Sequence, residues 1–419
     1  MLTKFVMIKQ NYPAEKINDT EKAVRDAVNV YSDELSKLKG KKVGIAVGSR
    51  GINKIDQVVR AIVRIVKEND ASPVVFNAMG SHGGGTPEGQ REVLESIGIT
   101  ESSVEAPIKT CAESTFLGIT ENDIDVYCNK LALKFDYVIL VNRIKPHTDF
   151  EDVTESGLFK LMAIGLGNPE GASIIHSNAL RMGYGPAIRE AGSLMLKKLP
   201  VFLALAVTEN WKHELNYVEA TLPENLLEFE KRILAKVKKE LVHLPADDID
   251  SLIIRDAGKN ISGTCVDTKV VGRIMIAGQK EPEKPDIKSI AVLNFTDESH
   301  GNAMGLGIVD VITKRAYDKI DINATSLTGI TSKCLLQAKI PCVAQNDYDA
   351  IKTAFESSKV KDMASLKAAF IRDTNSLEKM AVSLPLYEEI KNNKHIEIAS
   401  GPFVLEFDKD GNIVNMPEF

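Results

Sequence analysis

Short apolar runs, each followed at once by a polar loop, set the strongest limit on the fold of this chain. The runs Lys42–Val47, Pro73–Met79 and Tyr137–Val141 have the length and the β-branched content of buried strands. Between the first two lies a segment with apolar residues at helical spacing, from Val58 to Val66. Alternation of strand, loop and helix is typical of an α/β fold with mainly parallel sheets. This is the fold class that we expect.

Helix-start signals support the same alternation. Asp19 or Thr20 can cap a helix whose apolar residues recur every three or four positions up to Leu38. Thr86 followed by Pro87 combines a capping residue with a first-turn proline, which predicts the start of another helix.

The length of the chain predicts more than one domain. With 419 residues, two domains are the natural expectation. We expect an N-terminal catalytic and cofactor-binding α/β domain over residues 1–245, and a C-terminal α/β domain over residues 246–419. The second domain would complete an interdomain cleft that forms the active site. Its predicted elements are strands at Ser251–Arg255 and Ser289–Asn294, a helix near Ala303–Tyr317 and a C-terminal hairpin over Glu397–Val414.

Composition and charge exclude several classes of protein. The net charge of -6 argues against a general nucleic-acid binder, which usually presents a basic face. No apolar run is long enough to span a bilayer, and the first residues lack the apolar stretch of a signal peptide. We therefore expect a cytoplasmic protein that binds neither nucleic acid nor membrane, with an oligomer left open. The five cysteines are scattered and form no C-x-x-C pair, so no disulfide framework is indicated.

Three polar residues from distant segments each follow a predicted strand. Arg50 stands in Gly48–Gly51, His82 in Gly80–Gly85, and His147 shortly after the strand that ends at Val141. Ligands of parallel α/β sheets bind beyond the carboxyl ends of the strands, where these residues would converge. Arginine can grip a carboxylate with its planar fork. Either histidine can serve as a general base or as a metal ligand.

A glycine-rich stretch downstream adds two more candidates. Lys160 stands among apolar residues, where a lysine either reaches out to solvent or is desolvated and nucleophilic. His176 follows it in a similar apolar setting. Gly157, Gly165 and Gly167 lie around Lys160 and are expected to contact a cofactor. The spacing Gly165-x-Gly167-x-x-x-Gly171 could let backbone N–H groups cradle a phosphate. Because Gly165, Gly167 and Gly171 follow a helix instead of a strand, they do not form a dinucleotide-binding fingerprint.

These residues together resemble a known family, the nickel-pincer-nucleotide enzymes of the lactate racemase type. Gly80-Ser81-His82 resembles the family's Gly-x-His motif, and Pro146-His147 resembles its Pro-His motif. Lys160 resembles the lysine of the family's Gly-x-x-Lys setting, and His176 follows it at a similar distance. The resemblance covers most of the chain, including the two-domain plan, although its motifs lie between Arg50 and His176.

The resemblance implies a cofactor and a role for each residue. Lys160 would carry a pyridinium-3-thioamide-5-thiocarboxylate mononucleotide, whose two sulfurs and one ring carbon hold nickel, with His176 as the protein ligand. His82 and His147 would be the acid/base pair, and Arg50 would bind the substrate carboxylate. The implied activity is racemisation or epimerisation of a 2-hydroxy acid by reversible hydride transfer. The implied partners are this small acid and the proteins that synthesise the cofactor.

Several positions differ from the lactate racemase pattern. Val47 replaces an acidic residue three positions before Arg50, and Leu158-Phe159 separate the glycine from Lys160. In the second domain, the best alignment leaves Lys269 or Arg273 as substitutes for the substrate-binding residues. These differences favour a 2-hydroxy acid other than lactate, either larger or a sugar acid.

Two further interpretations remain open from the residues alone. A zinc hydrolase could use His82, His147 and His176 as ligands, with Glu155 as the general base. A non-catalytic relative could bind the small acid or the nucleotide without turnover.

Overall fold

The computed structural model describes residues 3–277 and 279–419 and divides into two compact units. The central unit is Ala14–Leu241, and the terminal unit joins the N-terminal residues up to Pro13 to Val242–Phe419. Both contain mainly parallel sheets with helices, so the expected α/β class is confirmed.

The central unit is built on a six-stranded sheet in the order β4-β3-β2-β7-β8-β9. Its strands are β2 (Lys42–Val47), β3 (Ser72–Asn77), β4 (Ile108–Lys109), β7 (Tyr137–Arg143), β8 (Val201–Glu209) and β9 (Leu215–Thr221). All neighbours are parallel except β8 and β9, and a small antiparallel hairpin, β5 (Ser114–Ile119) with β6 (Asp125–Asn129), lies outside this sheet. The chain moves outward from β2 to β3 and β4 and then returns to β7 on the other side of β2, which makes the β2–β7 junction a topological switch point.

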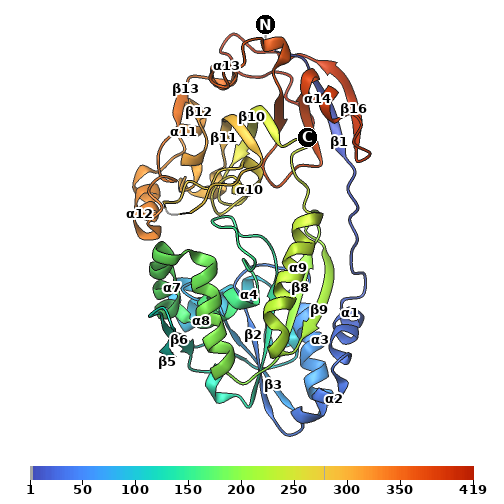
Figure 1. Cartoon of the computed structure of the whole chain (residues 1–419), viewed down its shortest axis with the longest axis vertical. Helices are drawn as coiled ribbons and strands as arrows, with labels where there is room; N and C mark the ends of the chain where they lie inside the picture. The colour runs from blue at the N-terminus through green and yellow to red at the C-terminus, as the bar shows by residue number, and fades with distance from the viewer. Residues whose placement is uncertain (1–2, 278) are drawn as a thin grey trace. The chain divides into compact units, whose positions relative to one another are not determined.

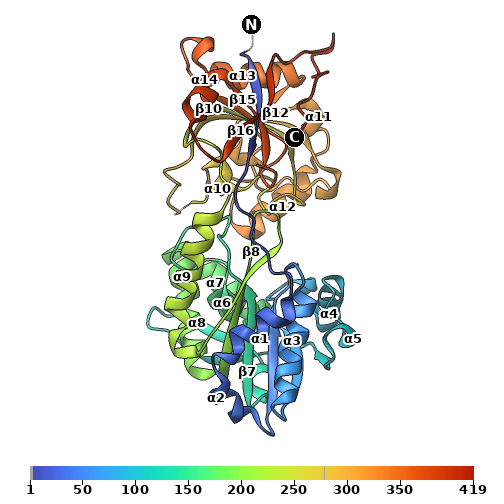
Figure 2. The same ribbon diagram turned by 90° about the vertical axis from the view of Figure 1, so that its right-hand side faces the viewer.

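Helices cover both faces of this sheet, with α8 and α9 on one side and α3 and α4 on the other (Figure 2). Side chains of β2 alternate between the two cores: Val43 and Ile45 pack toward α3, and Ala46 packs on the opposite face. The helices are α1 (Thr20–Asn29), α2 (Ser32–Leu35), α3 (Ile55–Glu68), α4 (Pro87–Ser96), α5 (Glu101–Val104), α6 (Leu158–Lys160), α7 (Asn168–Met182), α8 (Tyr184–Lys198) and α9 (Leu226–Glu240), with a π-helical segment at Leu161–Leu166 and short 3-10 turns at Ser36–Leu38, Gly83–Gly85, Ala132–Lys134 and Pro223–Asn225.

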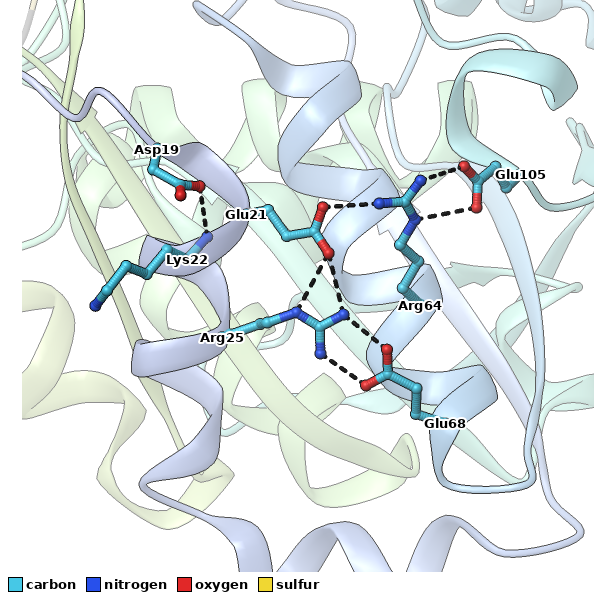
Figure 3. A network of polar contacts seen from close by, with 7 residues as sticks. All are labelled: Asp19, Glu21, Lys22, Arg25, Arg64, Glu68 and Glu105. Atoms are coloured by element: carbon cyan, nitrogen blue, oxygen red, sulfur yellow. Dashed lines mark hydrogen bonds and ion pairs between the residues drawn. The ribbon is translucent and has the colours of Figure 1, made fainter.

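Ion pairs join α1 to α3 on the outer surface of the central unit (Figure 3). Arg25 contacts Glu21 and Glu68, and Arg64 contacts Glu21 and Glu105. The guanidinium of Arg25 holds the pKa of Glu68 below its ordinary value. The predicted cap of α1 is confirmed, since the Asp19 side chain accepts a hydrogen bond from Lys22 N.

The helix expected to run on to Leu38 is interrupted. It ends at Asn29, and the backbone at Tyr31 leaves the helical region before α2 begins. The Tyr31 hydroxyl donates to the carbonyl of Ala220, next to the end of β9. The spacing of apolar residues favours one continuous helix, but the chain breaks it at Tyr31, whose side chain contacts β9 of the sheet.

The terminal unit contains an eight-stranded sheet in the order β13-β12-β11-β10-β14-β15-β1-β16. Its strands are β1 (Phe5–Gln10), β10 (Asp248–Ala257), β11 (Asp286–Phe295), β12 (Val311–Thr313), β13 (Cys342–Ala344), β14 (Ala368–Ile371), β15 (Lys379–Ser383) and β16 (Ile396–Phe403). The strands from β13 to β14 are parallel, whereas β15, β1 and β16 continue the sheet in antiparallel fashion.

The helices of the terminal unit are short. They are α10 (Thr268–Val271), α11 (Lys314–Tyr317), α12 (Ile322–Ser332), α13 (Asp347–Ser357) and α14 (Leu384–Ile390), with 3-10 turns at Asp297–Ser299, Leu306–Ile308 and Met363–Ser365. The helix predicted near Ala303–Tyr317 is therefore wrong over most of its length. A 3-10 turn, strand β12 and the single turn α11 occupy that segment, because the buried Val311 and Ile312 pair with β11 instead of continuing a helix.

The N-terminal strand belongs to the unit formed by the other end of the chain. In Figure 1, β1 (blue) lies beside β16 (red), and it pairs with both β15 and β16. Phe5, Val6, Met7 and Ile8 are all buried, as expected of a strand inside a sheet. The expected N-terminal domain included these residues, and its boundary at residue 245 lies close to the observed division at Val242.

The C-terminal tail differs in part from the expected hairpin. A turn does form, with Asp408 N bonded to Asn412 O and an isolated antiparallel bridge between Phe407 and Ile413. The strand before it, β16, pairs with β1 instead of folding back on the tail. No helix in the described part of the chain is both long and apolar enough to cross a membrane.

Candidate active site

The carboxyl ends of β3, β2 and β7 bring three of the predicted site residues to one edge of the central sheet. The strands are adjacent and parallel, so the loops that follow them begin at the same edge. Arg50 lies in the loop after β2, His82 in the loop after β3, and His147 in the loop after β7. The expected convergence is thus supported by the observed strand order, and it lies at the switch point where α/β sheets bind ligands.

The loop that carries His82 is tied to the stretch around Lys160. Gly80 takes a φ of 58°, a conformation that glycine adopts without strain, and its N–H donates to the carbonyl of Gly165 at 2.9 Å. The buried Gln90 side chain donates to the Gly80 carbonyl at 2.9 Å. Both backbone polar groups of Gly80 are therefore hydrogen-bonded, which fixes the loop that carries His82.

Lys160 ends the short helix α6 and precedes the π-helical segment Leu161–Leu166. Such π-helical insertions are rare and occur frequently at functional sites. The first turn is capped by a buried carboxylate from α9: Glu230 Oε2 accepts hydrogen bonds from Leu158 N at 2.7 Å and from Phe159 N at 3.0 Å. Burial raises the pKa of Glu230 to about 7, against the opposing effect of these two hydrogen bonds.

The three glycines predicted to bind cofactor are all buried in close packing contacts. A Cβ on Gly157 would lie 2.4 Å from Glu230 Oε1, and one on Gly165 would lie 2.5 Å from the carbonyl oxygen of Ala78. A Cβ on Gly167 would lie 2.6 Å from a backbone oxygen of the same stretch. Close approach of the backbone to neighbouring groups accounts for glycine at these three positions, and their contact with a cofactor stays a prediction.

Lys160 and His147 are in direct contact through Lys160 Nζ and His147 Nε2. Burial is the main cause that lowers the pKa of Lys160 to about 8; Asp149 opposes the shift, and the nearby cations Arg50 and Lys145 contribute to it. Of the two alternatives that the sequence left open for Lys160, the structure favours the desolvated amine.

A row of rings connects the two histidines that flank Lys160 in the sequence. His147 stacks on Phe150 with ring centroids 4.6 Å apart, and Phe150 stacks on Tyr184 at 5.4 Å. Tyr184 then meets His176 edge to face, with its hydroxyl 3.3 Å from His176 Nδ1. The hydroxyl engages Nδ1 and so leaves Nε2 of His176 for a ligand.

The loop of His147 is anchored by a buried carboxylate. Glu155, with a side-chain exposure of 0%, accepts from His147 N at 2.6 Å and from Asp152 N at 3.1 Å, and it pairs with Lys238 at 2.5 Å. Asp152 in turn pairs with Arg189 on α8. Glu155 therefore acts as a structural anchor, occupied by partners that a general base would have to release.

His82 and His176, the remaining predicted residues of the central unit, interact electrostatically with Lys160. Partial burial lowers the pKa of His82, and the cations Arg50 and Lys160 add to this effect. Partial burial and Lys160 likewise lower the pKa of His176, with Asp149 acting in the opposite direction. Both imidazoles are therefore biased toward the neutral form, which can take up a proton or bind a metal.

Sequence reasoning missed the buried ion pair of Arg143 and Glu209. These residues end β7 and β8, which are neighbouring strands, and Asn53 N also donates to Glu209 at 2.6 Å. Arg143 lies near enough to Arg50 for the two charges to interact. Arg50 itself forms no hydrogen bond or ion pair with any residue that the structure describes, so its guanidinium is available for an anion. Arg143 could have been found by its position directly after a predicted strand.

Phe150, Tyr184 and Glu230 gave no such signal. Their roles depend on contacts between segments that are distant in sequence.

Lys269 and Arg273, the two candidates from the second half of the chain, lie in the terminal unit. Lys269 is in α10, whose first turn is capped by Asp267. The guanidinium of Arg273 donates to Asp310 at 2.9 Å and to the carbonyls of Ile308, Ile287 and Lys288. These bonds give Arg273 a structural role that the sequence did not predict.

The arrangement of donors bears on which metal chemistry the site can support. Within residues 3–277 and 279–419, no group of three or more His, Cys, Asp and Glu side chains is placed to hold a metal ion. Catalytic zinc uses three protein ligands, so the three-histidine zinc site is not favoured. A metal whose other ligands belong to a cofactor needs only one imidazole, which His176 can supply.

Comparisons with known proteins agree with this fold. Residues 3–175 match the family model described as the lactate racemase N-terminal domain. No curated protein matches the chain significantly. Among solved structures, the chain is similar to the lactate racemase apoprotein from Thermoanaerobacterium thermosaccharolyticum, with a TM-score of 0.50 and 12% identity. The match covers 93% of this chain and 96% of that one, and at this identity it shows the fold.

Proposed function

The chain is a lactate racemase-like protein, and on this premise we propose that it is a racemase or epimerase of a 2-hydroxy acid. The observation that carries the proposal is the placement of Arg50, His82, His147 and Lys160 together at the switch point of the central sheet. A carboxylate-binding cation, two imidazoles and a buried amine are the groups that this reaction requires from the protein.

The strand order supports a two-base reaction. His82 and His147 follow β3 and β7, which flank β2, while Arg50 follows β2 itself. A substrate held by its carboxylate at Arg50 would therefore have one imidazole on each side. Inversion of a carbinol centre through a flat 2-oxo acid needs this arrangement, since one base removes the hydroxyl proton and the other returns it after the opposite face has reacted.

The residues of the site fit a tethered nickel-pincer nucleotide. Lys160 would hold the nucleotide covalently, and His176 would be the protein ligand of the nickel, a metal that accepts soft sulfur donors together with one imidazole. When bound, the cofactor supplies the acceptor that takes and returns the substrate hydride. Lys160, desolvated with a pKa of about 8, suits attachment, and the contact of Tyr184 with Nδ1 keeps Nε2 of His176 available.

We propose that the substrate is a 2-hydroxy acid other than lactate. Val47 replaces the acidic residue of lactate racemases, and Arg273 is bonded within its own unit. The surroundings of the substrate therefore differ from those of lactate racemases, and a larger acid or a sugar acid is the better candidate.

Mass spectrometry of the chain produced together with cofactor-synthesis proteins and nickel tests the proposal. We expect a mononucleotide-sized adduct on the peptide that contains Lys160, and no adduct in Lys160→Ala. The matched control, Lys198→Ala, removes an exposed lysine from the end of α8 and should keep the adduct. An unmodified Lys160 in a host that loads a lactate racemase would contradict the proposal. An adduct would be followed by a screen of 2-hydroxy acids for racemisation.

A further inference from the structure

The hydrogen bonds around His147 determine which of its ring nitrogens carries the proton. The backbone N–H of Asp149 donates to His147 Nδ1 at 3.0 Å. A nitrogen that accepts a hydrogen bond has no proton of its own, so the neutral ring carries its hydrogen on Nε2. The partner of Nε2 is Lys160 Nζ.

This tautomer in turn favours the neutral form of Lys160. A protonated lysine has three donors and no acceptor, and it cannot receive a hydrogen bond from Nε2–H. The contact is satisfied when Nζ is a neutral amine whose lone pair accepts the Nε2 proton. Among the described residues, no carboxylate oxygen is bonded to Nζ.

The other charged and titratable groups around Lys160 leave this assignment in place. Arg50 and Lys145 disfavour a second positive charge nearby, and Asp149 is the acid that acts against them. His82 and His176 also interact with Lys160 electrostatically, each with its pKa lowered.

We propose that His147 has a second task, which rests on the function proposed above: before the cofactor is attached, its Nε2–H stabilises the neutral form of the Lys160 amine, which is the form that is acylated. The lone pair of Nζ forms the bond to the acyl or thioacyl carbon of the incoming group. The leaving group departs with the electron pair of its own bond and with the proton that nitrogen releases. No oxidant or reductant is involved.

The contact between His147 Nε2 and Lys160 Nζ also determines which of the two tasks of His147 comes first. Once Nζ belongs to an amide or thioamide, its lone pair is delocalised and no longer accepts from Nε2–H. The imidazole is then released for proton transfer with the substrate. Acylation of Lys160 thus turns His147 from a partner of the lysine into an acid or base for the reaction.

Competitive acetylation of the full chain without cofactor tests the inference. Trace acetic anhydride is applied between pH 6 and pH 10, and peptide mass spectrometry compares Lys160 with the exposed Lys198. We expect the labelling of Lys160 to have a midpoint near pH 8 and to exceed that of Lys198 at pH 7. A Lys160 that reacts no faster than Lys198 at pH 7 would overturn the inference.

Two variants with opposite expected effects separate the hydrogen bond from general disruption. His147→Phe keeps a ring against Phe150 but removes the donor, and the labelling of Lys160 at pH 7 should fall about fivefold, the factor for one hydrogen bond of about 1 kcal/mol. Asp149→Asn keeps the backbone N–H and removes the opposing charge, so the labelling should rise. Unchanged labelling in His147→Phe would refute the role of His147.

The outcomes also distinguish this inference from the function on which it rests. A reactive Lys160 that never gains a nucleotide adduct in a competent host contradicts the cofactor alone. An adduct on Lys160 whose labelling does not depend on His147 contradicts the second task alone.

Discussion

At the scale of single residues, the chemistry of the site depends on groups that alter each other's charge. Arg50, His82 and Lys160 lie within electrostatic reach, and the two cations lower the pKa of the imidazole. The sequence identified these residues because polar groups after parallel strands must gather at one edge of the sheet. It could not identify the ring contacts of Phe150 and Tyr184, since these depend on how a loop meets the start of α8.

Replacement of Arg50 provides a test at this scale. In Arg50→Ala the pKa of His82 should rise, because a cation that disfavours the imidazolium has been removed. NMR titration of the ring measures this directly, and Arg60→Ala on α3 is the control, since its charge acts on Glu105 instead. In the loaded enzyme, kcat/KM should fall about 10- to 100-fold, as for the loss of a hydrogen bond to a charged group worth about 1.5–3 kcal/mol. An unchanged titration of His82 would contradict the predicted coupling.

At the scale of secondary structure, the sequence predicted the elements around the site well. Strand β2 occupies the predicted Lys42–Val47, and the caps of α1 and α4 are those expected. The predicted helix near Val311 in the terminal unit is wrong, because this buried apolar segment is too short to show a helical or strand period. The π-helical segment after Lys160 also had no sequence signal, and its first turn depends on Glu230 from a distant helix.

The pH dependence of stability tests the role of Glu230. Its pKa is about 7 in the folded chain and 4.5 in an unperturbed carboxyl, so between these values the folded state holds the proton more tightly. The stability that this group contributes is full below pH 4.5 and is lost as the pH rises to about 7.

Urea unfolding at pH 5 and pH 8 measures the effect. From pH 5 to pH 8, the free energy of unfolding of the native chain should fall relative to that of Glu230→Gln by on the order of 3 kcal/mol. Glu228→Gln, on the exposed side of the same helix, should show no such change. If the free energies of unfolding of the native chain and of Glu230→Gln differ by the same amount at pH 5 and at pH 8, the raised pKa of Glu230 is contradicted.

At the scale of the whole molecule, the two α/β units follow from the strand and helix pattern, but the membership of β1 does not. Its four consecutive buried residues, Phe5, Val6, Met7 and Ile8, suit any interior strand. Only pairing across the full length of the chain decides that β1 lies between β15 and β16.

Fragments of the chain test this division. Residues 14–241 are contiguous and have a core on each face of their sheet, so they should unfold cooperatively when expressed alone. Residues 242–419 alone lack β1, an interior strand of their sheet, and should not unfold cooperatively. Joining residues 1–13 to residue 242 through a short flexible linker should restore folding, because Gln10 already donates to the carbonyl of His243 at 3.0 Å. Thermal unfolding followed by circular dichroism measures all three, and a cooperative transition of 242–419 alone would refute the requirement for β1.

Because β1 lies between β15 and β16, which come near the other end of the sequence, it cannot pair until those strands have been synthesised. The ribosome makes β1 before the central unit and makes β15 and β16 after it. At typical rates of translation, this apolar strand waits on the order of a minute without its partners, while the central unit can fold. A chain truncated before β15 would combine a folded central unit with an unpaired β1 strand, which is open to chaperones and to aggregation. The closing of this sheet therefore waits until β15 and β16 have been made.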